Sequence, residues 1–307
     1  MLYKSTRGGG AHIASAEAIL AGIASDGGLF VPASEVKLVQ QDLENLVSKS
    51  YHERATYILQ HFLTDFNEVE LKDCVEKAYH TTKFNEAAIA PLSIINDELA
   101  VLELWHGPTY AFKDMALQLL PWLLIKSAKK TGDKANYVIL VATSGDTGKA
   151  ALEGFKDVSK TKILVFYPNQ GVSEVQRLQM ITQEGSNVGV VAVEGNFDDT
   201  QNGVKDIFND QKFKAYVGEK GYKLSSANSI NWGRLVPQIV YYISAYLDLV
   251  KFKKITLGTE INFVVPTGNF GNILAAYYAY KMGIPVGKFI CASNQNKVLT
   301  DFINTGI

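Results

Sequence analysis

Residues 137–155, YVILVATSGDTGKAALEGF, decide the fold class of this 307-residue chain. The apolar run YVILVA is typical of a buried strand, and KAALEGF has the apolar spacing of a helix. A turn of small residues, TSGDTG, joins the two. A strand, a small-residue turn and a helix in this order predict one unit of an α/β fold.

The same alternation continues along the rest of the chain. The expected strands are 137–142, 162–167, 188–193, 223–225, 262–265 and 289–292. The expected helices are 147–155, 173–183, 200–209, 232–250 and 273–282. Pro121 and Pro237 fall inside helical patterns and are expected to kink or break them. Short apolar strands separated by helices predict mostly parallel sheets flanked by helices.

The first 88 residues are expected to form a separate, largely helical N-terminal domain. Apolar residues recur at helical spacing between positions 37 and 82, and polar residues with a proline interrupt this pattern at 84–91. The glycines at 8–10 and 26–28 indicate short strands and turns, because no strand-to-helix context follows them. Residues 92–104 then read as a hairpin, and the region 89–307 carries the α/β pattern.

Composition excludes several classes of function. The formal net charge is −1 and the pI is near 6.5, so no nucleic-acid partner is expected. Cys74 and Cys291 stand far apart without a CxxC pair, and the five histidines lack metal-ligand spacing, so neither disulfides nor a metal are expected. No apolar run approaches the roughly 18 residues of a membrane span. We therefore expect a soluble cytoplasmic protein that binds no membrane.

One lysine stands in an unusual setting. In LELWHGPTYAFKDMA, residues 102–116, Lys113 lies between a short apolar run with a turn and an almost unbroken apolar helix that begins near Met115. Burial beside Phe112 would lower the pKa of its amine, which suits a lysine that forms a Schiff base. A lysine that merely extends to water is the common alternative. This window alone leaves both readings open.

Two strand-to-helix turns are candidate anion sites, because ligands of parallel sheets bind beyond the carboxyl ends of strands. In TSGDTG, residues 143–148, hydroxyls and free N–H groups suit a carboxylate or a phosphate, and helix capping by Ser144 or Asp146 is the equal alternative. In PTGNFGN, residues 266–272, two glycines flanking Asn269 and Phe270 allow the backbone to close round an anion. A Gly-rich capping turn is the alternative here, and the pairing with the first turn makes an anion site the better interpretation.

A third segment, SSANSINWGR, residues 225–234, places polar groups between a strand and a long helix. Arg234 would lie on the first turn of that helix. It can bind a substrate anion or pair with a nearby carboxylate, and for an isolated arginine the ion pair is the better interpretation.

Four segments in this order, HGPTYAFKD, ATSGDTG, SANSINWGR and VPTGNFGN, resemble the motifs of threonine synthase, a family of fold type II (tryptophan synthase β-like) pyridoxal-phosphate enzymes. YKSTRGGG and DGGLFVP resemble the N-terminus of its bacterial and fungal branch. The resemblance implies a pyridoxal 5'-phosphate cofactor and a carbon–oxygen lyase acting on phosphates. The implied reaction is the last step of threonine biosynthesis, in which γ-elimination and β-addition of water convert O-phospho-L-homoserine to L-threonine and phosphate.

The resemblance also implies roles for individual residues. Lys113 matches the Schiff-base lysine, and Asp146 stands where related enzymes often carry an asparagine beside the cofactor's 3′ oxygen. The cofactor phosphate loop corresponds to Gly268, Asn269, Phe270, Gly271 and Asn272. The substrate carboxylate is expected at Ser144 and Thr147, and the substrate phosphate at Ser229 and Arg234.

The family extends beyond the position of Ile307, so the resemblance implies a C-terminally truncated chain whose α/β catalytic region, 89–307, is incomplete. The residue that faces the pyridine nitrogen would lie in the missing part. Such a chain is expected to be a monomer or a homodimer. Two alternatives remain open: another fold type II lyase such as a serine/threonine dehydratase, and a catalytically silent homologue that binds phosphorylated metabolites.

Overall fold

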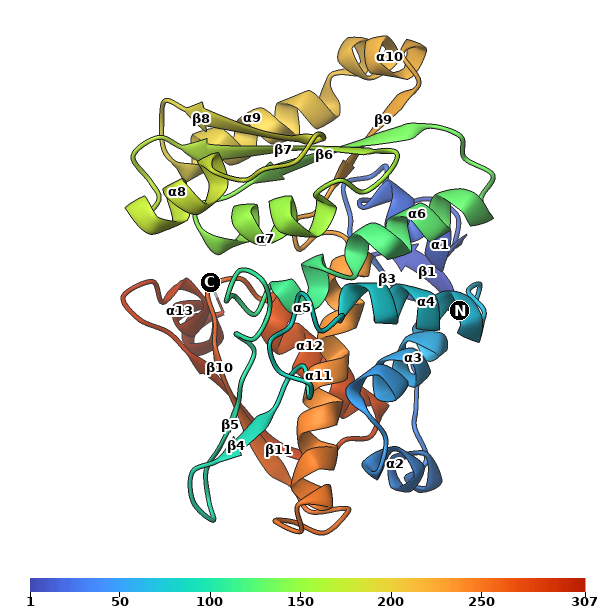
Figure 1. Ribbon diagram of the computed structural model, residues 1–307, viewed down its shortest axis with the longest axis vertical. Coiled ribbons are helices and arrows are strands. Elements are labelled where there is room, and N and C mark those ends of the chain that lie inside the picture. Colours follow the sequence, from blue (N-terminus) through green and yellow to red (C-terminus); the bar gives the residue numbers. More distant parts are fainter. Residues whose placement is uncertain (307) are drawn as a thin grey trace.

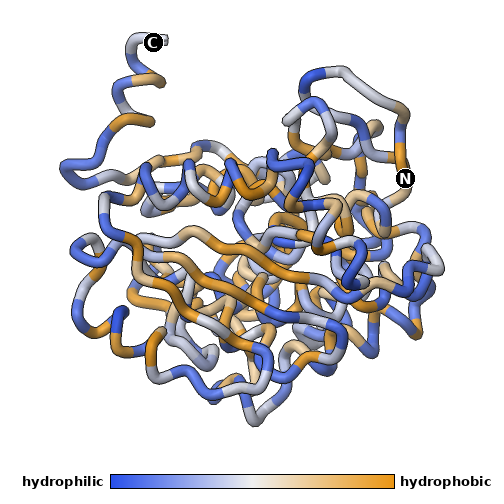
Figure 2. The backbone as a smooth tube through the Cα atoms, turned by 90° about the horizontal axis from the view of Figure 1, so that it is seen from above, coloured by the Kyte–Doolittle hydropathy of each residue, from blue (hydrophilic) through white to orange (hydrophobic). Residues whose placement is uncertain are grey.

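A four-stranded parallel sheet forms one layer of the structure, which is a computed structural model describing residues 1–306 (Figure 1). Its strand order is β8-β7-β6-β9, and all neighbours are parallel. The strands are β6 (Asn136–Ala142), β7 (Thr161–Pro168), β8 (Val188–Val193) and β9 (Tyr222–Ser226). Figure 2 shows them as hydrophobic stretches side by side. The four strands expected from the sequence here are confirmed, because buried parallel strands need apolar residues on both faces.

Helices cover both faces of this sheet. On one side lie α7 (Asp146–Phe155) and α8 (Glu174–Ile181), and on the other lie α9 (Phe197–Asn209) and α10 (Gln211–Glu219) (Figure 1). Side chains of β6 alternate between the two sides. Ile139 and Val141 join the main core, whereas Leu140 and Ala142 pack with Val204 of α9 in a second, small cluster. The expected α/β architecture is therefore confirmed.

A long helix, α11 (Trp232–Lys251), runs through the other half of the molecule and is buried along most of its length. It continues through Pro237 as a single helix, so of the expected kink or break at this proline the break is wrong. Beside it lie α12 (Gly271–Met282) and a two-stranded parallel sheet of β10 (Ile261–Pro266) and β11 (Val286–Ala292). The last helix, α13 (Val298–Thr305), has no buried residue and extends from the body (Figure 2).

The apolar stretch after Lys113 forms two helices instead of one. They are α5 (Asp114–Leu117) and α6 (Leu120–Lys130), and Pro121 stands in the first turn of α6. Proline is tolerated there because the first helical N–H groups have no partner within the helix. The break expected at Pro121 is confirmed.

The N-terminal part combines a small sheet with helices. The antiparallel sheet has the order β2-β1-β3, with β1 (Leu2–Ser5), β2 (Ile13–Ala14) and β3 (Phe30–Pro32). The helices are α1 (Ser15–Ala21), α2 (Gln40–Val47), α3 (Tyr51–Phe62) and α4 (Glu68–Ala78). They pack mainly against α6 and α11. The expected hairpin follows as β4 (Leu92–Ile94) and β5 (Ala100–Leu102). Within residues 1–306, none of the helices is both long and apolar enough to span a membrane.

Candidate active site

Lys113 lies immediately before α5, and its side chain is 12% exposed. β5 ends at Leu102, so the irregular segment 103–112, and not a simple strand-to-helix turn, leads to this lysine. Its Nζ forms an ion pair and hydrogen bond with Asp146 Oδ1 and lies 5.5 Å from the centre of the Phe112 ring. Burial lowers the pKa of the amine, the contact with Asp146 raises it, and the charge of Arg234 lowers it. The structure thus brings together three of the residues singled out in the sequence.

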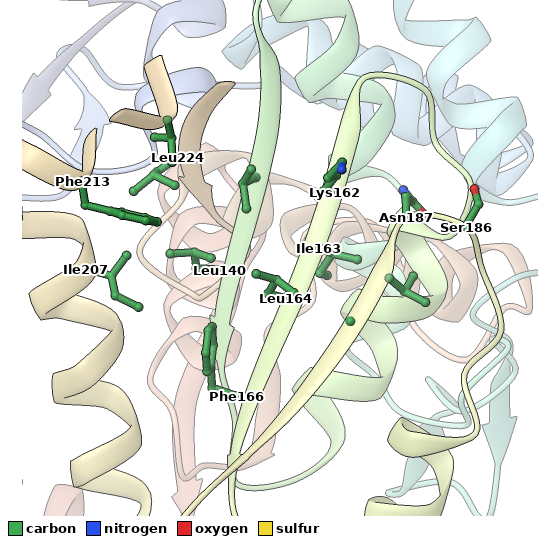
Figure 3. A pocket seen from close by; sticks show the side chains of 14 residues that line it. Leu140, Lys162, Ile163, Leu164, Phe166, Ser186, Asn187, Ile207, Phe213 and Leu224 are labelled. Carbon is green, nitrogen blue, oxygen red and sulfur yellow. The ribbon is translucent and has the colours of Figure 1, made fainter. Parts of the chain in front are cut away.

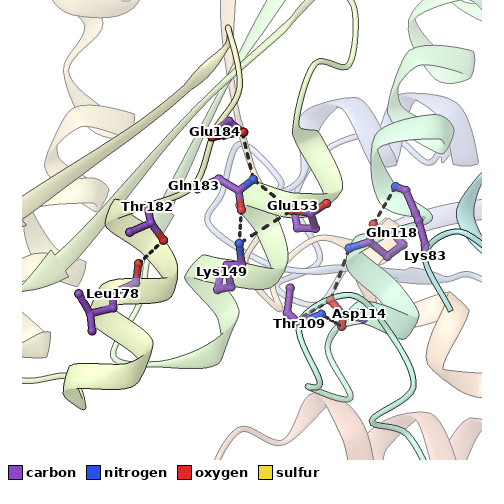
Figure 4. Close-up of polar contacts among 10 residues, drawn as sticks. All are labelled: Lys83, Thr109, Asp114, Gln118, Lys149, Glu153, Leu178, Thr182, Gln183 and Glu184. Atoms are coloured by element: carbon purple, nitrogen blue, oxygen red, sulfur yellow. Dashed lines mark hydrogen bonds and ion pairs between the residues drawn. The ribbon is translucent and has the colours of Figure 1, made fainter. Parts of the chain in front are cut away.

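Asp114 fixes the turn that precedes Lys113 (Figure 4). The backbone N–H and the hydroxyl of Thr109 each donate to its carboxylate at 2.8 Å, and Gln118 Nε2 donates at 3.4 Å. Gln118 in turn accepts from Lys83 Nζ at 2.9 Å. Burial raises the pKa of Asp114 to about 6. This carboxylate is not among the residues predicted from the sequence, although its position beside Lys113 at the start of a buried helix was a usable signal.

Backbone contact between two helices sets the position of Asp146 relative to Lys113. A Cβ atom on Gly154, near the end of α7, would lie 2.1 Å from the carbonyl oxygen of Leu117 in α5. Only glycine allows this approach. Asp146 and Lys113 stand at the N-terminal ends of these two packed helices, which keeps their side chains in contact.

The turn before α7 is held by Thr143. The Thr143 hydroxyl accepts from the N–H groups of Gly145 and Gly148 at 3.1 and 3.0 Å and donates to the Gly145 carbonyl. Gly145 is the N-cap residue, so the alternative of capping by Ser144 or Asp146 is wrong. In residues 1–306, the hydroxyls of Ser144 and Thr147 find no hydrogen-bond partner, which leaves them available to a ligand.

The turn between β10 and α12 offers a run of free backbone donors. The N–H groups from Gly268 to Ile273 donate to no protein acceptor in the described part of the chain. A Cβ atom on Gly268 would meet nothing within 4 Å. Unpaired N–H groups at a helix start attract anions through their hydrogen bonds and the helix dipole. The turn therefore has the geometry of an anion site.

Ser229 lies beside this turn, because a Cβ atom on Gly271 would be 3.8 Å from Ser229 Cβ. The segment that carries Ser229 is tied to the end of β6 by Asn228, whose Nδ2 donates to the Ala142 carbonyl at 3.1 Å. A residue expected at the substrate phosphate is thus placed next to the loop expected at the cofactor phosphate.

Arg234 is a buried cation without a carboxylate partner. Its side chain donates to the Ala227 carbonyl at 2.8 Å, and the residue is 4% exposed. Across residues 1–306, no carboxylate oxygen comes within ion-pair distance of it, so the interpretation as an ion pair is wrong. Burial lowers its pKa to about 10, opposed by the nearby charge of Asp146, and the guanidinium remains charged at neutral pH. A buried cation of this kind is suited to an anionic ligand.

A separate cavity of about 460 Å³ lies between the four-stranded sheet and helices α9 and α10 (Figure 3). Its walls are mostly apolar and include Leu140, Leu164, Phe166, Ile207 and Phe213. None of the residues expected at the site lines it, and its polar lining side chains are Lys162, Ser186 and Asn187. The residues singled out in the sequence therefore lie away from this cavity, in the region of Lys113, Asp146 and Arg234.

Comparison with known sequences matches two families. Residues 2–79 match the family described as threonine synthase N terminus, and residues 90–307 match the family described as pyridoxal-phosphate dependent enzyme. Threonine synthase-like 1 of Homo sapiens is 49% identical over 299 residues, which cover 94% of this chain and 40% of that protein. Threonine synthase of Pseudomonas aeruginosa is 43% identical over 305 residues, which cover 99% of this chain and 62% of that protein. The chain thus spans between two fifths and two thirds of the length of these relatives.

Solved structures give the same picture. Pyridoxal-phosphate-bound threonine synthase from Brucella melitensis superimposes with a TM-score of 0.89 at 40% identity, covering 100% of this chain and 63% of that one. Threonine synthase from Escherichia coli superimposes with a TM-score of 0.85 at 31% identity, covering 100% of this chain and 67% of that one. The fold type II architecture expected from the sequence is confirmed.

Proposed function

Because this chain belongs to the threonine synthase family of pyridoxal-phosphate dependent enzymes, we propose that it converts O-phospho-L-homoserine and water to L-threonine and phosphate. This reaction is the last step of threonine biosynthesis and makes the protein a carbon–oxygen lyase acting on phosphates. Lys113 is the proposed catalytic residue. The observation that carries the proposal is the buried, unpaired cation of Arg234 close to the Lys113–Asp146 pair.

The residues near Lys113 fit the cofactor. A largely buried amine with a lowered pKa is a suitable nucleophile for the aldehyde of pyridoxal phosphate. The free N–H groups of the 268–273 turn suit its phosphate, held by Gly268, Asn269, Phe270, Gly271 and Asn272. Asp146, which contacts the Lys113 amine, would lie beside the polar edge of the ring. When bound, the cofactor supplies an electron sink for charge that develops on the substrate.

The remaining residues bind and orient the substrate in this proposal. The free hydroxyls of Ser144 and Thr147, at the positive end of α7, bind the substrate carboxylate. Arg234 and Ser229 bind the substrate phosphate. Lys113 carries protons to and from the substrate carbons, and its lowered pKa brings proton exchange closer to neutral pH.

Arg234 also separates this function from the dehydratase alternative. Serine and threonine carry no phosphate, so a dehydratase substrate would leave this buried cation uncompensated. A dianionic phosphate provides both the charge and the paired acceptors that a guanidinium binds. The position of Arg234 therefore favours a phosphorylated substrate.

Release of inorganic phosphate from O-phospho-L-homoserine in the presence of pyridoxal phosphate tests the proposal. L-serine and L-threonine, scored by 2-oxo acid formation, test the dehydratase alternative. We expect phosphate release with threonine as co-product and no 2-oxo acid. Phosphate release without threonine, or 2-oxo acid formation alone, would contradict the assignment.

Borohydride trapping tests the role of Lys113 independently of turnover. Reduction in the presence of pyridoxal phosphate is expected to add the cofactor's mass to the peptide that contains Lys113. Lys113→Ala should lose both the label and phosphate release, whereas Lys149→Ala, which removes a part-buried lysine bonded to Gln183, should keep the label. Labelling of Lys113 without turnover would favour a catalytically silent homologue.

We also propose a cytoplasmic location. Both cysteines are free, and burial raises the pKa of the Cys74 thiol to about 12, so this thiol is unreactive. Free thiols are typical of a reducing compartment. Fractionation of cells that produce the chain, followed by immunodetection, tests this location.

A further inference from the structure

The side chain of Asn272, the second residue of α12, is held by two tyrosines of α11. The hydroxyls of Tyr241 and Tyr242 both donate to its Oδ1, the latter at 2.7 Å. Its amide nitrogen donates to no protein group in the described residues. Asn272 therefore has one fully bonded end and one free end, at the start of the helix whose N–H groups form the anion-binding turn.

The two tyrosines differ in what else they can bond. Tyr241 is also within 3.2 Å of Gln238 Oε1, so its O–H group has a second acceptor. Tyr242 donates to Asn272 Oδ1, and within residues 1–306 its other neighbouring polar group is the phenol of Tyr241, whose ring centre is 4.8 Å from its own. Both side chains are buried, and burial raises the pKa of both phenols, so both keep their protons at neutral pH.

These bonds select one orientation of the amide. If the Asn272 amide were rotated by half a turn, its NH2 group would face the phenols, and the buried O–H of Tyr242 would lose the Asn272 oxygen and keep only the oxygen of Tyr241 as a neighbour. An unsatisfied buried donor is unfavourable. Tyr241 could turn to Gln238 in that state, and so it does not enforce the orientation by itself. Tyr242 is the residue that enforces the orientation of the amide.

The same contacts connect the turn to Arg234. Gln238 Nε2 donates to the Arg234 carbonyl at 2.8 Å, and Gln238 accepts from Tyr241. These residues are spaced three and four apart and share one side of α11. One helix therefore supports both the proposed substrate arginine and the start of α12.

We propose that Tyr242, supported by Tyr241, is a positioning residue that makes Asn272 present its amide nitrogen, and not its oxygen, to the phosphate of pyridoxal phosphate. The inference deepens the proposed function and rests on it. Its chemical content is selectivity: an amide N–H2 group binds a phosphate oxygen, whereas an amide oxygen would repel it. Tyr242 should therefore affect the affinity for ligands that carry the phosphate and leave the affinity for ligands that lack it unchanged.

Comparison of pyridoxal phosphate with pyridoxal, which lacks the phosphate, tests this inference. Binding is followed by titration, with borohydride trapping at Lys113 as the readout. For Tyr242→Phe we expect about tenfold weaker binding of pyridoxal phosphate and unchanged binding of pyridoxal. Tyr241→Phe should change the affinity for pyridoxal phosphate less than threefold, since Tyr242 remains. Tyr137→Phe, which removes a phenol bonded to Asp133 near the start of β6, at the opposite end of the strand from the 143–148 turn, is the matched control and should change neither affinity.

Asn272 variants keep the test decisive if Tyr242→Phe is unstable. Asn272→Asp retains an acceptor for both phenols but presents a charged oxygen, so the affinity for pyridoxal phosphate should fall more than tenfold with pyridoxal unaffected. In a double-mutant cycle, Tyr242→Phe should add little to Asn272→Ala, because the phenol acts through the amide.

Three outcomes would overturn the inference: equal losses for both ligands, no loss with Tyr242→Phe, or full additivity in the cycle. Failure of the proposed function looks different. In that case the unmodified chain itself would bind pyridoxal phosphate no better than pyridoxal, or would not be labelled at Lys113.

Discussion

Replacement of Arg234 by methionine is expected to weaken phosphate binding strongly while leaving the fold nearly as stable as before. The guanidinium is 4% exposed, donates to the Ala227 carbonyl, and has no carboxylate partner among residues 1–306. A hydrogen bond to a charged group contributes about 1.5–3 kcal/mol. Two such bonds from the planar fork to a phosphate give about 3–6 kcal/mol, which corresponds to roughly 10²- to 10⁴-fold in affinity.

The stability of the fold follows from the same contacts. Methionine removes a buried charge that has no counter-ion, which is often neutral or stabilising by about 1–4 kcal/mol. It also leaves the Ala227 carbonyl without its donor, at a cost of about 1–3 kcal/mol. These terms nearly cancel, so the free energy of unfolding should change by no more than about 2 kcal/mol.

Arg54 offers a matched control. It is equally buried, at 2% exposure, but it pairs with Asp248 at 2.7 Å and donates to the carbonyls of Leu46, Val47 and Ser244. Arg54→Met should therefore destabilise the fold by about 3–5 kcal/mol, because it leaves a carboxylate and three carbonyls without their partner. The contrast separates a binding arginine from a structural one.

The assay combines thermal unfolding with kinetics on protein saturated with pyridoxal phosphate. Inorganic phosphate at 100 times its dissociation constant stabilises a binding protein by about 2.7 kcal/mol, so it should raise the Tm of the unmodified chain and not that of Arg234→Met. The value of kcat/KM for phosphate release should fall by the same 10²- to 10⁴-fold, with trapping at Lys113 retained. If Arg234→Met unfolds as readily as Arg54→Met, or loses trapping and keeps the phosphate response, the reasoning is wrong.

Three further predictions concern the surroundings of the lysine. Because burial lowers the pKa of Lys113, its reductive methylation should reach half-maximum at a lower pH than that of exposed lysines. Peptide mass spectrometry follows the reaction, and a midpoint equal to that of the exposed lysines would contradict the prediction. The pKa of Asp114 is raised to about 6, so the folded state holds one more proton than the unfolded state between pH 4 and 6. The free energy of unfolding should therefore fall as the pH rises through this range, by about 3 kcal/mol. Urea denaturation measures this fall, and Asp114→Asn, which cannot titrate, is the reference. Gly154→Ala should destabilise the protein by at least about 2 kcal/mol, because its Cβ would lie 2.1 Å from the Leu117 carbonyl oxygen. Gly203→Ala, in α9 with no atom within 4 Å of the added Cβ, should stabilise the protein by about 0.5–1 kcal/mol. Similar Tm shifts for the two variants would contradict this prediction.

The strands and most helices could be predicted because an element that is buried on both faces appears in the sequence as a run of apolar residues. The helix α10 was missed because none of its residues is buried and its apolar face is short, with Phe213 and Val217 lining the cavity. The effect of each proline depended on its surroundings. Pro121 breaks its pattern at the first turn of α6, whereas Pro237 stays inside α11, where packing on all sides maintains the helix.

The candidate site residues could be singled out from the sequence one by one, but their pairing could not be predicted. That Lys113 meets Asp146 depends on how closely α7 packs on α5, and a sequence does not state that distance. Whether Arg234 has a carboxylate neighbour depends in the same way on which segments surround α11. The bonds from Tyr241 and Tyr242 to Asn272 join segments about thirty residues apart, and no periodicity connects them.

The close approach of α5 and α7 at Gly154 has a consequence for motion. No side chain separates the two backbones there, so no change of rotamer can accommodate a shift between them. The backbones of Lys113 and Asp146 are therefore expected to move together as one rigid body. Any motion that separates the amine from its carboxylate by moving the two backbones would first have to part α5 from α7 at Gly154.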